Sequence, residues 1–206
     1  MVLAMVGDYL LGAGTIGQSA SPEAIWGIEW NVAPDWRYAV SSILGFCCAA
    51  LFAVAAVEAL KVLETKYQAK GIWYKLFKLG NWAGILYFAF IHIGICMLPV
   101  VFNAGYDATG GDTLAAARMV MRVTKSIIVP MGFGFIACDG LVTAGWMGLV
   151  FKGGFPLKKW MFILTPLTIA LIGQAFNLIP LPFEGVDSGF ESFGWLLMYA
   201  AMAKTL

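Results

Sequence analysis

The chain has 206 residues, of which 61% are hydrophobic and only 12% are charged. This balance leaves too little polar surface to cover a globular domain in water, so it excludes an ordinary soluble protein and predicts a membrane protein. The net charge of +1, without a basic face, excludes a nucleic-acid-binding protein, whose affinity comes from phosphate contacts. We expect a single transmembrane domain over residues 1–206.

Apolar stretches that approach membrane-crossing length follow one another along the whole sequence. A helix needs about 20 residues to cross about 30 Å of hydrocarbon. The alternation of period two that marks a membrane barrel does not occur. We therefore expect an all-α, polytopic bundle of about six transmembrane helices with an additional outer amphipathic helix. The expected spans lie near residues 1–14, 38–60, 81–102, 127–151, 160–179 and 188–204.

The first expected span, residues 1–14, carries Asp8 and has no basic segment before it. We therefore interpret it as a membrane helix rather than a cleavable signal peptide. The connection that follows places Trp26, Trp30 and Trp36 among acids and prolines. This composition is typical of a segment that rests at the level of the lipid headgroups.

Lysines gather in the connections after the second and fourth spans, whereas the other connections are acidic or mixed. The lysines of the two connections are Lys61, Lys66, Lys70, Lys75, Lys78, Lys152, Lys158 and Lys159. Because cytoplasmic loops carry the excess of Lys and Arg, we expect both connections and both termini in the cytoplasm. The chain is thus expected to be a multi-pass protein of the cell membrane.

Several short motifs occur in a fixed order along the first half of the chain. They are GDYLL at residues 7–11, the pair Trp36–Arg37, Gly45 in the second span and His92 midway along the third. In order and spacing, over about two thirds of the chain, they resemble a group of small multi-pass bacterial membrane proteins of unassigned function. The resemblance implies a bacterial inner membrane and no particular activity, and it links Asp8, Arg37 and His92.

Polar side chains inside the expected spans each require a partner or water, because an ionisable group at the bilayer centre costs at least ~2.5–3.5 kcal/mol. They are Asp8, His92, Asp139, Gln174, Asn177 and Glu191. By the helical rise of about 1.5 Å per residue, His92 and Asp139 lie near the midplane and the others toward the outer side. We expect a polar intramembrane cavity that opens outward, and an ion pair between Asp8 and Arg37 near its mouth.

Arg118, Arg122 and Lys125 recur at i, i+4 and i+7, and so align on one face of a helix that Pro130 is expected to bend or break. One interpretation is an interfacial helix attracted to anionic lipid. The other is a cationic stripe that faces the acidic outer loops and closes a vestibule or holds an anionic headgroup. The sequence leaves both open.

His92 is the only histidine of the chain. Its neighbours one helical turn away are Phe88, Ala89, Ile95 and Cys96. Partners for both ring nitrogens must therefore come from other helices, water or a ligand. In one interpretation a neutral imidazole bonds to a facing Ser, Thr or backbone carbonyl. In the other, Asp139 or Asp8 lies within hydrogen-bond reach and His92 exchanges a proton with a substrate.

Three classes of function fit these features. The first is an enzyme that acts on a lipid-like or steroid-like apolar substrate by acid–base chemistry, with His92, Asp139 and Asp8 as catalytic residues. The alternatives are a proton-coupled small transporter and a non-catalytic accessory subunit. The expected partners are membrane lipids or an apolar small molecule, and a second copy of the chain. The expected substrate-binding residues are Arg37, Arg118, Arg122, Lys125, Gln174, Asn177 and Glu191.

Neither a metal nor another cofactor is expected. One histidine cannot supply a multi-histidine zinc site or bis-histidine haem, and the carboxylates have no recognisable ligand spacing. The four cysteines lie in apolar runs without a C-x-x-C pair, so we interpret them as buried small hydrophobes. The glycines of GAGTIG lead into a loop and do not join a strand to a helix, as a phosphate-binding motif would.

Overall fold

The computed structural model describes residues 1–12, 14–15, 34–152, 155–176, 179, 183–184 and 186–205. Its α-helices are α1 (Val2–Gly12), α2 (Asp35–Thr65), α3 (Gly71–Ala108), α4 (Thr113–Phe135), α5 (Leu141–Phe151), α6 (Pro166–Phe176) and α7 (Phe190–Ala203). Three short turns join them: the π-helical η2 (Ile136–Gly140) and the 3₁₀-helical η3 (Lys159–Ile163) and η4 (Val186–Gly189). A two-residue antiparallel pair, β1 (Gly14–Thr15) and β2 (Phe183–Glu184), completes the described structure.

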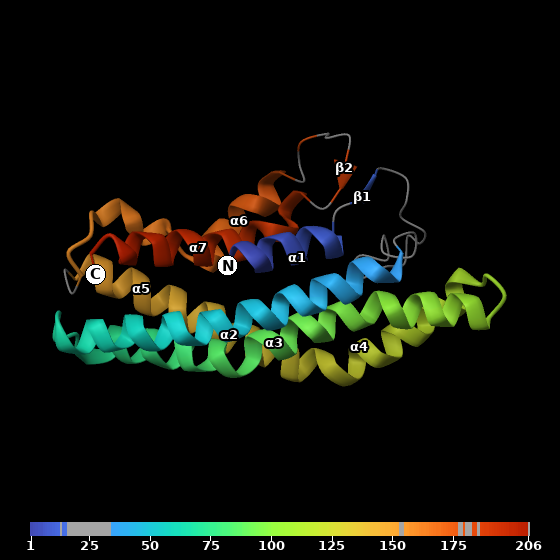
Figure 1. Ribbon diagram of the computed structural model, residues 1–206, viewed down its shortest axis with the longest axis horizontal. Coiled ribbons are helices and arrows are strands. Elements are labelled where there is room, and N and C mark those ends of the chain that lie inside the picture. Colours follow the sequence, from blue (N-terminus) through green and yellow to red (C-terminus); the bar gives the residue numbers. More distant parts are fainter. Residues whose placement is uncertain are drawn as a thin grey trace.

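The helices form two layers (Figure 1). The long helices α2 and α3 lie together with the rod formed by α4, η2 and α5, and the shorter helices α1, α6 and α7 lie on the other side. The main core lies where α7 meets α2, α3 and α5. Its largest fully buried side chains are Trp146, Trp195, Phe77, Leu63, Met198 and Met202.

Three stretches are long and apolar enough to cross a membrane: Asp35–Thr65, Gly71–Ala108 and Val129–Phe151. Val2–Gly12 and Pro166–Phe176 are apolar but shorter. The outward faces of the long helices carry large apolar side chains, as a lipid-facing surface requires; on α2 these include Ile43, Phe46, Leu51 and Val54. The all-α class and the fit to a membrane protein are therefore confirmed, while the number of six spans stays a prediction.

Two helix boundaries differ from the expectation. Pro130 was expected to bend or break its helix, and the break does not occur, because α4 continues through this residue to Phe135 and runs on through η2 into α5. Pro130 is exposed, so its ring points away from the packed interior, and membrane helices tolerate the lost backbone bond. The fifth apolar stretch begins with the turn η3, and its α-helix covers only Pro166–Phe176.

The carboxyl end of the chain lies beside the α2–α3 connection. Lys66 Nζ donates to the carbonyl of Thr205 over 2.9 Å, and the hydroxyl of Tyr67 donates to the same oxygen. We call this end of the bundle, which contains Lys66, Tyr67 and Thr205, the lysine end. The start of α2 and the end of α3 lie at the opposite end, where α1 packs antiparallel to α2. With 11 residues, α1 is about 16 Å long.

Candidate functional site

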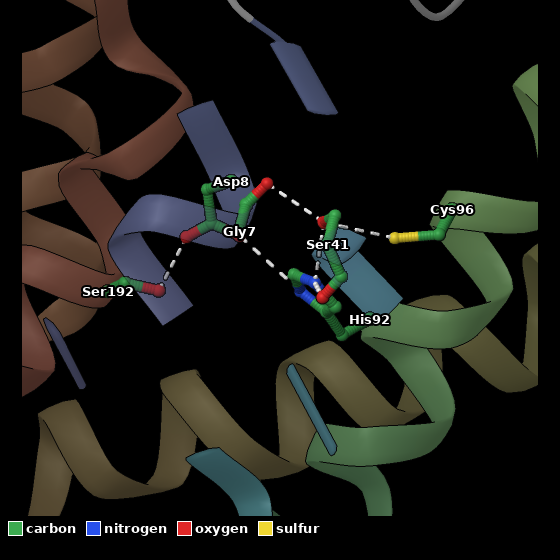
Figure 2. Close-up of polar contacts among 6 residues, drawn as sticks. All are labelled: Gly7, Asp8, Ser41, His92, Cys96 and Ser192. Atoms are coloured by element: carbon green, nitrogen blue, oxygen red, sulfur yellow. Dashed lines mark hydrogen bonds and ion pairs between the residues drawn. The ribbon is translucent and has the colours of Figure 1, made fainter. Parts of the chain in front are cut away.

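Three helices meet at His92, and glycines make room for its ring (Figure 2). His92 comes from α3, and Gly7 of α1 lies against its imidazole. Gly45 of α2, which is not drawn in the figure, also lies against the ring. A Cβ at Gly45 would lie 2.1 Å from His92 Cδ2, and one at Gly7 would lie 3.3 Å from Nε2. The hydroxyl of Ser41, one turn before Gly45, donates to the Gly7 carbonyl over 2.8 Å and ties α2 to α1.

Both ring nitrogens of His92 have partners on other helices. Nδ1 lies 3.4 Å from Oδ1 of Asp8. Nε2 lies 3.1 Å from the hydroxyl and 3.1 Å from the carbonyl oxygen of Ser41. The geometry thus combines features of both interpretations of the sequence: a facing serine at one nitrogen and an acid at the other. Of the two acids considered, Asp8 is the one beside His92.

The hydrogen bonds around Ser41 determine where the protons lie. The Ser41 hydroxyl proton goes to the Gly7 carbonyl, and the thiol of Cys96 donates to the same hydroxyl oxygen over 3.3 Å. The Ser41 carbonyl can only accept. Nε2 of His92 must therefore be the donor to both Ser41 oxygens, so it carries a proton. When Nδ1 also carries a proton, the imidazolium forms an ion pair with the Asp8 carboxylate.

Asp8 links this centre to α7 and is its more accessible member. Its second oxygen, Oδ2, accepts a bond of 2.6 Å from the hydroxyl of Ser192. The Asp8 side chain is 17% exposed and that of His92 is 8% exposed. Arg37 reaches the same part of α1, since its Nη2 donates to the carbonyl of Tyr9 over 3.3 Å.

Asp139 belongs to a separate cluster. It lies in the π-helical turn η2, is 2% exposed, and accepts a bond of 2.8 Å from the indole nitrogen of Trp195. Glu191 lies in the first turn of α7, directly before Ser192. Since Ser192 and Trp195 are three residues apart, one turn of α7 contacts both Asp8 and Asp139.

The remaining expected site residues are more dispersed. Gln174 hydrogen-bonds to Asp187 of η4. Arg118, Arg122 and Lys125 are exposed on α4, which packs mainly against α3 and has α2 and α3 between it and α1 (Figure 1). Asn177 lies outside the described residues.

Four residues of the two clusters were not singled out from the sequence: Ser41, Cys96, Ser192 and Trp195. Each is uncharged, so none stands out in an apolar stretch as an ionisable residue does. One signal was available, because Ser41 and Gly45 form a small-xxx-small pair, a pattern that brings membrane helices close together. Among the described residues, no group of three or more His, Cys, Asp or Glu side chains could hold a metal ion.

Comparison with known proteins gives a family and no activity. No curated protein and no solved structure matches the chain. The site therefore has to be interpreted from its own geometry. The pattern of a family of unknown function, DUF6796, matches residues 1–206, and the chain belongs to that family.

Proposed function

We propose that this membrane protein is an enzyme that transfers a proton to or from a lipid-like apolar molecule, with the Asp8–His92 pair as its acid–base centre. The observation that carries the proposal is the 3.4 Å contact between Nδ1 and the Asp8 carboxyl group, with Nε2 already committed as a donor to Ser41. One exchangeable proton lies between the two groups. The more exposed group of the two, Asp8, is where a substrate would meet it.

The surroundings of the pair suit this chemistry. General acid–base catalysis needs a group whose orientation is fixed and whose proton can leave and return. Ser41 holds one edge of the imidazole, and Ser192 holds the second oxygen of Asp8. The Asp8 carboxyl group contacts both His92 and Ser192. A proton can therefore move between Asp8 and His92 without any change in the fold.

The location of the pair supports an apolar substrate. The pair lies beside α2 and α3, both of which are candidate membrane spans. Polar groups lie near one end of α1, where Arg37 contacts the Tyr9 carbonyl and Gln174 contacts Asp187. A molecule with an apolar body and a polar head would place its head at these groups and its body against the helices.

The test compares lipids from membranes that contain the wild-type protein, His92→Gln or Asp8→Asn, incubated in deuterium oxide. A proton-transfer enzyme leaves solvent deuterium in its product, so mass spectrometry should find a lipid species labelled only with the wild-type protein. Glu58→Gln is the matched control, because Glu58 is exposed at the lysine end. Identical lipid profiles for the wild type and both site variants would refute the proposal.

A proton-coupled transporter is the second candidate, and the buried Asp139, a second acid at the α7 interface, favours it. Acids at two places along the α7 interface are what a protein needs to bind protons in succession. Reconstituted vesicles with an internal pH indicator distinguish the two functions. Net proton movement that depends on Asp8 supports transport, whereas lipid conversion without proton movement supports the enzyme.

We also propose that the chain crosses the cell membrane six times with both termini in the cytoplasm. The lysine-rich connections and the position of Thr205 beside Lys66 and Tyr67 support this orientation. The exposed Arg118, Arg122 and Lys125 would then meet anionic headgroups at the opposite surface, which is the interfacial interpretation of that helix.

A further inference from the structure

One face of α7 carries three hydrogen-bonding side chains that each reach another part of the bundle. Ser192, Trp195 and Tyr199 follow one another at i, i+3 and i+7, so they lie on the same face of the helix. Their partners, in the same order, are Asp8 of α1, Asp139 of η2 and Asn81 of α3. Buried polar groups thus follow α7 from its first turn toward the lysine end.

Thr143 of α5 lies beside this row of polar groups. It follows Asp139 by four residues, which places the two one helical turn apart on one side of the helix. A Cβ at Gly80 would lie 2.6 Å from the backbone nitrogen of Val142, so the next residues, Asn81 and Thr143, lie at one level of the bundle. Thr143 is 7% exposed, and its hydroxyl has no hydrogen-bond partner among the described residues.

The unpaired state of this hydroxyl contrasts with the behaviour of other helical threonines in the chain. Thr65 and Thr109 each donate to the backbone carbonyl four residues earlier. For Thr143 that residue is Asp139, which lies in the π-helical turn η2 and so departs from α-helical geometry. A buried hydroxyl without a partner is unfavourable, because it has given up its bonds to water and gained none.

The neighbouring Asp139 side chain has the capacity to bind the same ligand as Thr143. Asp139 is 2% exposed, and its Oδ1 accepts one bond of 2.8 Å from the indole of Trp195. The two oxygens of a carboxylate have about four acceptor positions, so Asp139 can accept further bonds. A ligand that accepts from Thr143 and donates to Asp139 satisfies both groups, and internal water does this in many proteins.

We propose that Thr143 and Asp139 bind an internal water molecule between α5 and α7, at a site separate from Asp8–His92. The water accepts the proton of the Thr143 hydroxyl and donates to a carboxylate oxygen of Asp139. It thereby gives the buried acid a partner with an exchangeable proton, which packing alone does not supply. This inference stands without the proposed enzyme, since no step of that reaction enters it.

The melting temperature of Thr143→Val in detergent tests the site, because valine has nearly the shape of threonine and no hydroxyl. If water is bound, the variant loses a hydrogen-bonded group, and its melting temperature should fall by about 2–4 °C. If the hydroxyl is simply unpaired, its removal should raise the melting temperature. Thr65→Val is the control, since the Thr65 hydroxyl is exposed and solvent can replace its bond to the Lys61 carbonyl.

A structure of the wild-type protein at a resolution that shows ordered water makes the test independent of the variants. We expect a water within about 2.5–3.0 Å of Thr143 Oγ1 and of one carboxylate oxygen of Asp139. An unchanged or higher melting temperature of Thr143→Val would overturn the inference. So would a structure without this water, whatever the melting temperature. Neither result bears on the Asp8–His92 contact, so the proposed acid–base centre would remain to be judged by its own test.

Discussion

At the scale of single residues, the space for the His92 imidazole depends on a glycine, Gly45, which has no side chain to occupy it. The Cβ of an alanine at position 45 would lie 2.1 Å from Cδ2 of His92 and 2.7 Å from Cγ. The ring cannot move aside freely, because Asp8 and Ser41 hold both of its nitrogens. Gly45 is thus part of the site although it contributes no functional group.

Gly45→Ala should destabilise the protein by ~1–3 kcal/mol, the usual cost of overpacking a tight interior. Gly132→Ala is the control, since a Cβ there meets nothing within 4 Å. Replacing a glycine inside an open helical surface should be neutral or stabilise by ~0.5–1 kcal/mol. Thermal unfolding in detergent measures both. Equal stability of the two variants would show that the close approach of α2 to His92 is not real.

The pair Asp8 and His92 should show strong energetic coupling. The side chains are 17% and 8% exposed, so removing one leaves the other buried without its partner. We expect the loss of stability in the double variant Asp8→Asn/His92→Gln to fall short of the sum of the single losses by ~0.5–3 kcal/mol.

The exposed pair Glu58 and Lys61 provides the matched comparison. These groups lie 4.0 Å apart with side chains 62% and 67% exposed, so solvent screens them. Their coupling in the same double-mutant analysis should be at most ~0.5 kcal/mol. Additive losses for Asp8 and His92 as well would mean that the two residues do not interact in the folded protein.

How far the sequence predicts this centre depends on what each residue signals. His92 and Asp8 stand out because ionisable groups are rare in apolar runs, and the helical rise places them at useful depths. The rise does not give the angle at which a side chain leaves its helix, so it could not decide between Asp8 and Asp139 as the partner of His92. Serine is common in membrane helices, so Ser41 and Ser192 could not be recognised as site residues before the packing of the helices was known.

At the scale of helices, α3 and α5 approach closely through two glycines. A Cβ at Gly145 would lie 2.3 Å from the backbone nitrogen of Phe77, and one at Gly80 would lie 2.6 Å from the backbone nitrogen of Val142. Small residues at such crossings let the backbones of membrane helices come together. This contact fixes α5, and through η2 it fixes the position of Asp139.

Gly145→Ala should therefore lower stability by ~1–3 kcal/mol or more, because the obstructing atoms belong to the backbone and cannot rotate away. It should also disturb Asp139 from a distance. We expect the indole N–H resonance of Trp195, whose proton is bound to Asp139, to shift in this variant. An unchanged melting temperature together with an unchanged Trp195 resonance would contradict the α3–α5 packing.

Element boundaries show the same division between what a sequence reveals and what packing decides. Hydropathy locates the apolar centres of α2 and α3, but both helices continue past them, to Thr65 and Ala108, because the backbone hydrogen bonds of a helix do not require apolar side chains. Pro130 marks a possible break, yet α4 continues where the ring meets no obstacle. The π-helical turn at Asp139 has no sequence signature at all.

At the scale of the whole molecule, the length of α3 determines how the helix can fit a membrane. Its 38 residues extend over about 57 Å, whereas the hydrocarbon layer is about 30 Å thick. The α3–α4 hairpin has its own small core of Leu98, Phe102, Ala116, Ala117 and Val120. We predict that this part of the hairpin lies outside the hydrocarbon.

The two ends of α3 should accordingly lie on opposite sides of the membrane, with the lysine end in the cytoplasm. Single cysteines at the exposed positions Gln68 and Ala108 test this by labelling with an impermeant thiol reagent. In intact cells the reagent should label Ala108→Cys and not Gln68→Cys, and permeabilised cells should label both. Lys204→Cys should behave like Gln68→Cys, since Thr205 is bound to Lys66 and Tyr67. Wild-type protein shows the background from Cys47, the exposed native cysteine. Labelling of Gln68→Cys but not Ala108→Cys in intact cells would reverse the orientation, and labelling of both would mean that α3 does not span the membrane.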